Sequence, residues 1–136
     1  MSEIVTATAF IDKTYDEAMT LLVEARNYVA YQEAADAERL DMDVKLLVSQ
    51  ETMRITTRLT QVMAWLFGQR AARDGEITLD EALGEAYELG GAGVCLDDSH
   101  TRDERLPPAV RSLLHRTRNL YLRVQRLETM LRAGAA

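Results

Sequence analysis

The feature that most constrains the fold is a row of residues near the carboxyl end, spaced alternately four and three positions apart. With one polar exception the row is apolar, and it consists of Leu106, Val110, Leu113, Thr117, Leu120, Val124, Leu127 and Leu131. This spacing places every member on one side of an α-helix and is typical of the seam between packed helices. Pro107 and Pro108 suit the first turn of such a helix. The row therefore predicts a long helix that packs along another, parallel or nearly antiparallel, at a shallow angle.

A second long helix is predicted over residues 43–73, where the same alternating spacing recurs. Its members are Val48, Thr52, Ile55, Leu59, Val62 and Leu66. The later half is also apolar on its other sides, through Met53, Met63, Trp65 and Phe67, so we expect it to be covered from more than one direction. This helix should end at Asp74-Gly75, because glycine readily adopts the left-handed conformation that follows a helix.

Two stretches, residues 14–17 and 78–81, have the form of a capping box, a threonine followed three residues later by a glutamate. The first predicts a helix from residue 14 that fades near residue 35. The second predicts a short helix to about residue 89, ended by the glycine-rich stretch 90–93. Residues 94–105 would then form a connecting segment whose apolar start tucks under the bundle.

These elements predict an all-α fold, a bundle of three long helices with one additional short helix between the second and the third. A length of 136 residues is enough for one domain with its own core and too short for two ordinary domains. The composition, 47% hydrophobic and 28% charged, is that of a globular chain. We expect an N-terminal arm at residues 1–13, a single helical-bundle domain at residues 14–132 and a short C-terminal tail at residues 133–136.

Nothing in the sequence indicates secretion or insertion into a membrane. Cys95 is the only cysteine, so the chain cannot form an internal disulfide or a cysteine metal cluster. Met1-Ser2-Glu3 carries an acid where a signal peptide would carry positive charge. The longest dense apolar run, residues 62–67, is far shorter than the roughly 18 residues that span a bilayer. We therefore predict a cytoplasmic protein without membrane association.

The formal net charge of −6 hides a segregation of charge along the chain. Residues 44–73 carry five basic residues and one acid, residues 107–132 carry six arginines and one acid, and residues 74–104 carry ten acids and one arginine. The acidic total argues against a general nucleic-acid-binding protein, since affinity for phosphates comes mainly from basic charge. Two interpretations follow. Either the acidic segments, including the first helix, neutralise the basic helices, or the arginines form an exposed surface for an acidic partner.

The residues that could carry chemistry form no recognisable catalytic or metal-binding pattern. His100 lies among acids, but one histidine with flexible carboxylates lacks the fixed geometry of a metal site. His115 should be exposed, and Cys95 has no basic neighbour to stabilise a thiolate. The glycines of residues 90–93 follow no strand, unlike those of a phosphate-binding loop. We predict a protein that is not an enzyme and needs neither metal nor cofactor.

The candidate functional surface is a polar cluster on the second long helix. Threonine is a poor helix former, yet Thr52, Thr56, Thr57 and Thr60 crowd one stretch of this helix. Hydroxyl groups bonded back to the preceding turn would explain part of the cluster, and a protein-binding surface anchored by arginine and tryptophan would explain it equally well. The residues predicted to bind a partner are Arg54, Thr57, Arg58, Gln61, Trp65, Gln69 and Arg70.

Three parts of the chain carry a family resemblance. The first part is Glu51-Thr52-Met53-Arg54-Ile55-Thr56-Thr57-Arg58-Leu59-Thr60-Gln61 with Trp65-Leu66 and Gln69-Arg70, the second is Gly75-Glu76-Ile77-Thr78-Leu79 with Leu89-Gly90-Gly91, and the third begins at Leu106-Pro107-Pro108. Together they resemble the RcdA family, the bacterial regulators of CtrA degradation, over about residues 14–131. The resemblance implies a three-helix bundle that dimerises and has no enzymatic activity. It also implies an adaptor role, in which CtrA and other clients are delivered to the ClpXP protease with partner adaptors.

The leading hypothesis is a non-enzymatic cytoplasmic adaptor that binds proteins through its second helix and, given the apolar residues 62–67, forms a homodimer. Its expected partners are a ClpXP-type protease, other adaptors and a CtrA-like client. The alternative is a small nucleic-acid-associated transcriptional accessory protein that uses the arginines of the second and third helices. The final Ala135-Ala136 is similar to the small apolar ends that ClpX-type unfoldases read, which adds the hypothesis of a degradation signal.

Overall fold

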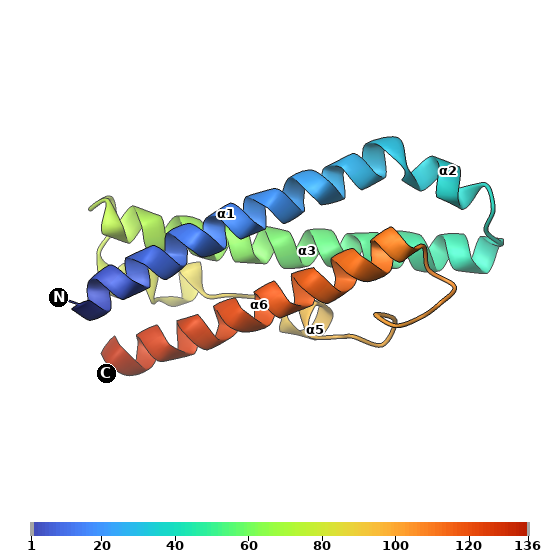
Figure 1. Cartoon of the computed structure of the whole chain (residues 1–136). Helices are drawn as coiled ribbons and strands as arrows, with labels where there is room; N and C mark the ends of the chain where they lie inside the picture. The colour runs from blue at the N-terminus through green and yellow to red at the C-terminus, as the bar shows by residue number, and fades with distance from the viewer. Residues whose placement is uncertain (1, 136) are drawn as a thin grey trace.

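The structure, a computed structural model, describes the backbone of residues 2–135 and the side chains of residues 8–134. The described elements are α1 Ser2–Tyr31, α2 Glu33–Ala37, α3 Met42–Arg73, α4 Leu79–Ala82, the 3-10 helix η1 Glu85–Tyr87, α5 Ala92–Cys95 and α6 Pro108–Ala135, with no strand among them. Figure 1 shows α1, α3 and α6 as three long helices that lie side by side. The predicted all-α class with three long helices is therefore confirmed.

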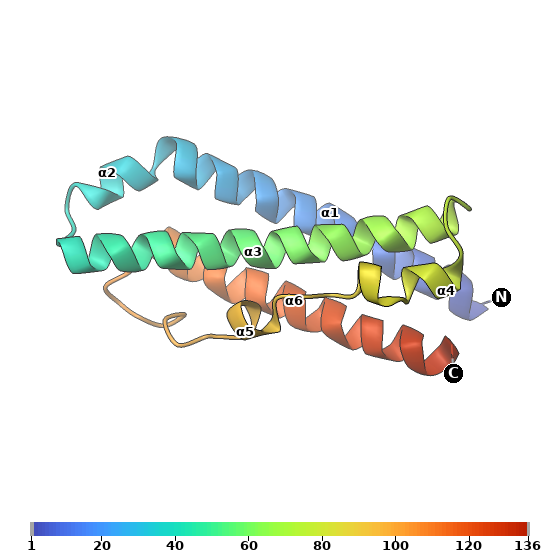
Figure 2. The ribbon, with the colours of Figure 1, turned by 180° about the vertical axis from the view of Figure 1, so that it is seen from behind.

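The three long helices do not simply alternate in direction. α1 and α3 run antiparallel and are joined through α2 at one end of the bundle, whereas α3 and α6 run parallel (Figure 1). A parallel pair needs a connection that returns along the bundle, and residues 74–107 supply it. This segment, here called the connector, carries α4, η1 and α5 along the side of α3 and α6 (Figure 2).

α1 begins at Ser2 rather than at residue 14, so the predicted irregular arm at residues 1–13 is wrong. Its buried residues alternate by three and four, like those of the other long helices, and they are Ile11, Thr14, Ala18, Leu21, Ala25 and Tyr28. Thr14 is therefore a seam residue inside the helix and not its cap. Residues 2–31 contain no glycine or proline, so no helix-breaking residue separates residues 2–13 from the rest of α1. Leu22 and Val29, on another side of α1, are exposed.

α3 and α6 form largely where the sequence predicted them. α3 ends just before Gly75, which has the left-handed φ of 78° expected after a helix. α6 begins at Pro108 and continues to Ala135, so the tail predicted at residues 133–136 is helical as far as the structure describes it. Ala136 and the side chain of Ala135 lie outside the described residues, and so does the proposed terminal degradation signal.

The short elements agree with the prediction only in part. The capping box is present, because Thr78 Oγ1 accepts a hydrogen bond from the Glu81 N–H at 3.1 Å and the Glu81 carboxylate accepts one from the Thr78 N–H. The helix that it opens ends at Ala82 instead of near residue 89, and η1 follows after Gly84. α2 and α5 were not predicted, because a helix of four or five residues is too short to show a periodic pattern.

α3 is the element most completely surrounded by the rest of the chain. Leu59, Val62, Trp65 and Leu66 are buried on it, between α1, α6 and the connector. Cys95 is also fully buried, as expected for the apolar stretch that opens the connecting segment. In the part of the chain that the structure describes, no helix is both long enough and apolar enough to cross a membrane.

Candidate functional site

α3 turns its charged side chains inward. Between Lys45 and Arg70 the helix carries only three charged residues, Glu51, Arg54 and Arg58, and all three are buried. Removing a charge from water is costly unless hydrogen bonds and opposite charges compensate for it. The groups that compensate for these three side chains come mainly from the connector and from α6.

Arg58 is 0% exposed and bonds to three backbone carbonyls. Its Nε donates to the carbonyl oxygen of Cys95 at 2.8 Å, one terminal nitrogen donates to that of Leu114 at 2.9 Å, and the other donates to that of Asp97 at 2.7 Å. Burial, followed by the nearby charge of Arg54, lowers the pKa of Arg58 to about 10. The guanidinium therefore stays charged at neutral pH, and it joins α3 to α6 and to the connector.

Arg54 makes a second link to the connector, one turn earlier on α3. Its Nε donates to the buried Glu51 carboxylate at 2.8 Å, and a terminal nitrogen donates to the carbonyl oxygen of Val94 at 2.6 Å. His100 lies nearby, with Nδ1 3.6 Å from Glu51 Oε1. Glu51 thus orients Arg54, and Arg54 in turn holds the connector.

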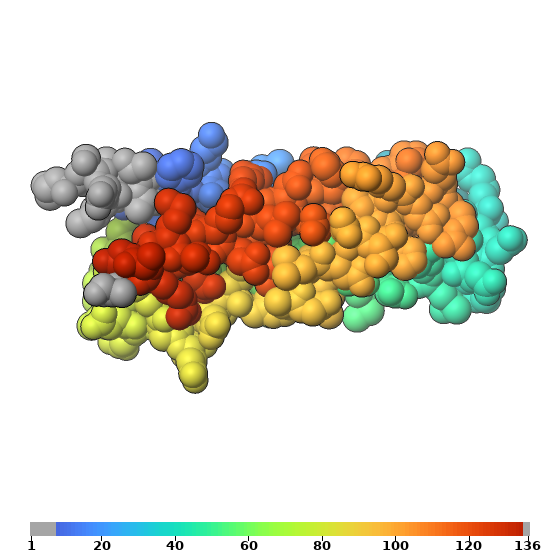
Figure 3. Space-filling view, turned by 90° about the horizontal axis from the view of Figure 1, so that it is seen from below, coloured from blue at the N-terminus to red at the C-terminus, as the bar shows by residue number. Residues whose placement is uncertain are grey.

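The connector is bound largely through its backbone. Its N–H and C=O groups between residues 89 and 97 bond to side chains of α3 and α6, namely Arg54, Arg58, Gln61, Arg118, Tyr121 and Glu128. Burial is the largest cause that raises the pKa of Tyr121 to about 12, so its hydroxyl remains a donor to Gly90. Figure 3 shows the connector, yellow to orange, lying along the red end and middle of α6.

Four of the seven residues predicted to bind a partner are buried, namely Arg54, Arg58, Trp65 and Gln69. The interpretation of Arg54 and Arg58 as an exposed arginine surface is wrong, because both guanidinium groups are occupied by bonds within the chain. These two residues and Gln61 come together around the connector. Trp65 belongs to the hydrophobic core.

The other three predicted residues are at least partly accessible. Thr57 Oγ1 donates to the carbonyl oxygen of Met53 at 2.8 Å, which is the bond back to the preceding turn that the threonine cluster suggested. Gln61 accepts a hydrogen bond from the Gly90 N–H at 3.0 Å. Arg70 lies over the ring of Tyr15, with its guanidinium carbon 4.2 Å from the ring centre.

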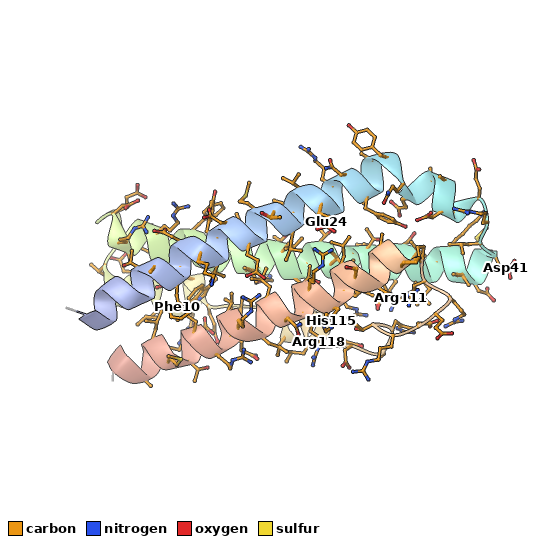
Figure 4. The ribbon with its side chains drawn as sticks, viewed as in Figure 1. Phe10, Glu24, Asp41, Arg111, His115 and Arg118 are labelled. Carbon is orange, nitrogen blue, oxygen red and sulfur yellow. The ribbon has the colours of Figure 1, made fainter. Side chains whose placement is uncertain are left out.

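The acidic first helix neutralises much of the basic charge on its neighbours. The pairs are Arg116 with Glu24, Arg123 with Glu17 and Arg73 with Asp12. The arginine of each of the first two pairs donates both terminal nitrogens to its carboxylate. Figure 4 shows Glu24 on the side of α1 from which it reaches α6. These pairings support neutralisation within the chain, and they remove arginines on which the nucleic-acid alternative depended.

The outward side of α3 is a second candidate site, here called the outer face. Its exposed residues are Leu46, Ser49, Gln50, Met53, Thr56, Thr60, Ala64 and Phe67, none of which is charged. Leu46, Met53, Thr60 and Phe67 follow one another at intervals of seven and therefore form one stripe, roughly 30 Å long at the standard helical rise. Depletion of charge together with exposed methionine and phenylalanine is typical of the centre of a protein–protein interface.

α1 widens the outer face. The rings of Tyr15 and Phe67 lie beside each other, with their centres 6.1 Å apart. Because α1 and α3 run antiparallel, one heptad further along α1 brings Leu22 level with Thr60 of α3, and the next brings Val29 level with Met53. Leu22 and Val29 are both exposed. The seven-residue interval of the exposed stripe can be found in the sequence, but the buried seam of α3 repeats with the same period. The sequence pattern alone therefore predicted the seam and not the exposed stripe.

The side chains that could bind a metal are dispersed. Among the described residues, no three histidine, cysteine, aspartate or glutamate side chains are grouped so that they could hold a metal ion. Burial raises the pKa of the Cys95 thiol despite the arginines nearby. His115 is exposed on α6, as predicted, with Nε2 3.2 Å from the amide nitrogen of Asn119.

The fold and these sites define a class of protein, a three-helix bundle whose long connector is tied down by buried arginines and whose central helix presents an uncharged face. The comparisons with known proteins give its family. The model of the family described as "Protein of unknown function (DUF1465)" matches residues 2–136, and the chain belongs to this family. A search of curated proteins found no match.

One solved structure extends the family assignment. The crystal structure of RcdA from Caulobacter crescentus CB15 is similar to this chain, with 34% sequence identity, a TM-score of 0.72 and coverage of 89% of both chains. The RcdA-family resemblance found in the sequence is therefore confirmed, and so is the all-α bundle that it implied.

Proposed function

We propose that this chain is a non-enzymatic, cytoplasmic regulatory adaptor that acts by binding other proteins. Its relationship to RcdA, a regulator of CtrA degradation, supports a role in delivering a CtrA-like client to a ClpXP-type protease together with other adaptors. The single observation that carries the proposal is the outer face of α3, which is exposed, partly apolar and free of charge. A surface of this kind is favoured where a partner covers it.

A second copy of the chain is the first partner that we propose for the outer face. A face without charge meets its own copy without repulsion, as the self-complementary interface of a two-fold dimer requires. Leu22, Val29, Met53 and Phe67 supply apolar side chains from both α1 and α3. The protease, client and companion adaptors would then bind the dimer, with Thr57, Gln61 and Arg70 at the accessible border of the face.

Degradation of a CtrA-like client by purified ClpXP, with and without this chain, tests the adaptor role. We expect the client to be degraded faster when the wild-type chain and its companion adaptors are present. Met53→Glu should remove most of this acceleration, because Met53 is 71% exposed near the centre of the outer face and the substitution adds a charge there.

Met130→Glu is the matched control for this experiment. Met130 is an exposed methionine of α6, outside the outer face, so the variant should act like the wild type. A wild-type chain that leaves degradation unchanged contradicts the adaptor proposal. Equal activity of Met53→Glu and wild type would instead show that the outer face is not the surface used.

A further inference from the structure

A polar cavity of about 550 Å³ lies between the connector and α6, away from the outer face. Its lining includes Asp98, Thr101 and Arg102 from the connector and His115, Arg118 and Asn119 from α6. Figure 4 shows His115 and Arg118 on the side of α6 turned away from α1. This volume is within the range of small-ligand sites.

Two guanidinium groups in the cavity lining are available to a ligand. Arg102 is exposed and has no ion pair among the described residues. Arg118 is held in place by its Nε, which donates to the carbonyl oxygen of Leu96 at 3.0 Å. The terminal nitrogens of Arg118 make no hydrogen bond in the described structure, and one of them lies 3.9 Å from the Asp98 carboxylate. Arg118 is thus fixed in position, and its terminal nitrogens have only this long ion pair with Asp98.

The cavity also offers neutral donors. Asn119 and His115 are joined at 3.2 Å, one turn apart on α6. The Thr101 hydroxyl is buried in the cavity wall and makes no hydrogen bond in the described structure. The neighbouring carboxylates of Asp97 and Asp103 are already occupied, the first by Ser99 and the second by Arg105.

We propose that this cavity binds a phosphate monoester. The three terminal oxygens of a phosphate monoester need several donors around them, and clustered arginines bind such groups with charge-assisted hydrogen bonds. Arg102 and Arg118 supply these, with Thr101 and Asn119 beside them. Asp98 is the single carboxylate in the lining, and it competes with the ligand for Arg118. The remaining volume holds the group that carries the phosphate.

The site is built before the ligand arrives. Its connector half follows directly on the backbone carbonyls that Arg54, Arg58 and Arg118 hold. A ligand therefore does not have to order this part of the chain, which lowers the cost of binding. The site is separate from the outer face and does not depend on the proposed adaptor role.

Titration of the isotope-labelled full chain with phosphoserine, followed by amide NMR, tests the proposal. We expect saturable shifts confined to residues 98–102 and to the stretch of α6 around Asn119, including its side-chain amide. Arg102→Ala should weaken binding roughly tenfold, the loss of one charge-assisted hydrogen bond. Asp98→Asn should tighten binding a few-fold, because it removes the competing carboxylate. Both residues are exposed, so both variants should fold.

Arg126→Ala is the matched control, since Arg126 is an exposed arginine of α6 outside the cavity. It should leave the affinity unchanged. Equal weakening by Arg102→Ala and Arg126→Ala, or no tightening with Asp98→Asn, would overturn the proposal in favour of unspecific attraction. So would equally tight binding of acetate.

Two further titrations identify the source of the phosphate monoester. A phosphoserine peptide that binds more tightly than glycerol phosphate supports a phosphorylated protein as the source. The reverse order supports a free metabolite. A failure to bind any of the three phosphate monoesters would overturn the proposal.

Discussion

At the scale of single residues, Arg58 is the buried side chain that joins α3 to both α6 and the connector. It has no exposed surface, yet its cationic group satisfies carbonyl oxygens of both α6 and the connector. A buried charge of this kind contributes little stability compared with a well-packed apolar core, but removing one partner leaves the others without hydrogen bonds. Loss of Arg58 is therefore costly mainly because the carbonyl oxygens that it bonds to would lose this donor.

Arg58→Met should lower the free energy of unfolding by about 3–5 kcal/mol, because the connector carbonyls of Cys95 and Asp97 lose their donor while the volume is nearly kept. Urea denaturation followed by circular dichroism measures this loss. Arg126→Met is the control, and it should change stability by less than about 0.5 kcal/mol because Arg126 is exposed. A loss of less than about 1 kcal/mol for Arg58→Met would mean that the connector does not need this arginine.

The pair of Glu24 and Arg116 predicts a dependence of stability on pH. The hydrogen bond from Arg116 is the largest cause that lowers the pKa of Glu24 below its ordinary 4.5. Because the folded-state pKa is the lower one, the stabilisation is complete above pH 4.5 and is lost as the pH falls through the folded-state pKa. The two side chains are 39% and 45% exposed, so the effect should be only about 0.5–1 kcal/mol.

Glu24→Gln should therefore be less stable than the wild type at pH 7, and the difference should shrink in acid. Urea midpoints for both chains at neutral pH and near pH 3 measure this change. Glu38→Gln provides a control, because Glu38 is exposed and has no ion pair among the described residues. A difference between Glu24→Gln and wild type that is constant with pH would contradict the linkage.

At the scale of elements, the connector is the segment whose conformation is set by its surroundings. Gly91 immediately precedes α5 and has a φ of 75°, and a Cβ atom there would lie 3.2 Å from Cys95 Sγ and 3.3 Å from Gln61 Cγ. Gly93, two residues later, lies inside α5 with open space around it. A side chain is therefore disfavoured at Gly91 and tolerated at Gly93.

Gly91→Ala should lower the free energy of unfolding by about 1–2 kcal/mol, through backbone strain and the close contacts. It should also speed amide exchange in residues 89–97, because the connector loses its fit against α3 and α6. Gly93→Ala should be neutral or slightly stabilising, since alanine is the better helix former. Thermal unfolding and hydrogen exchange of both variants check this, and equal effects at the two positions would contradict it.

The elements also show why sequence predicted the seams better than the sites. The alternating rows of α3 and α6 produce long buried contacts, and such rows are visible without any knowledge of neighbours. The predicted start of α1, residue 14, is too late, because the threonine–glutamate pair at residues 14–17 has the pattern of a cap although it lies inside the helix. The path of the connector could not be predicted, because its backbone groups bond to the side chains of Arg58, Arg118 and Tyr121. Such bonds do not depend on which residue types the connector itself carries.

The exposure of Arg54 and Arg58 was mispredicted for a related reason. Arg54 and Arg58 resembled an exposed surface because arginine is mostly exposed in proteins, and only the packing reveals that their partners are internal carbonyls. The outer face lay one helical side away from the predicted cluster, at positions whose small and apolar residues resembled additional core. Sequence therefore predicted the helix α3 itself but not which of its sides is exposed.

At the scale of the whole molecule, charge is distributed in a way that isolates one face. The ion pairs tie α1 to α3 and α6, and the charged residues of α3 between Lys45 and Arg70 are buried. Most of the remaining acids lie in the connector, on another side of α3 from α1. The outer face is thus an extended surface of α3 without exposed charge. A second uncharged surface can cover it without removing a charged group from water.

The geometry of the outer face predicts how two copies would meet. The stripe runs from Leu46 to Phe67, and Met53 lies about one helical turn from its centre. A two-fold dimer that covers the whole stripe must place its axis near that centre, and each Met53 then lies close to the Met53 of the other copy whether the helices cross parallel or antiparallel. The wild type should be a dimer at micromolar concentration by light scattering.

Single charges at this position should separate the copies, and opposite charges should rejoin them. Met53→Lys and Met53→Glu should each be monomeric, because like charges meet at the axis, whereas an equal mixture of the two should form a heterodimer. Met130→Glu should remain dimeric, since it lies outside the face. If both Met53 variants stay dimeric, the copies meet elsewhere. If both are monomeric and the mixture does not associate, Met53 lies within the interface but away from its axis, and the proposed two-fold arrangement is wrong.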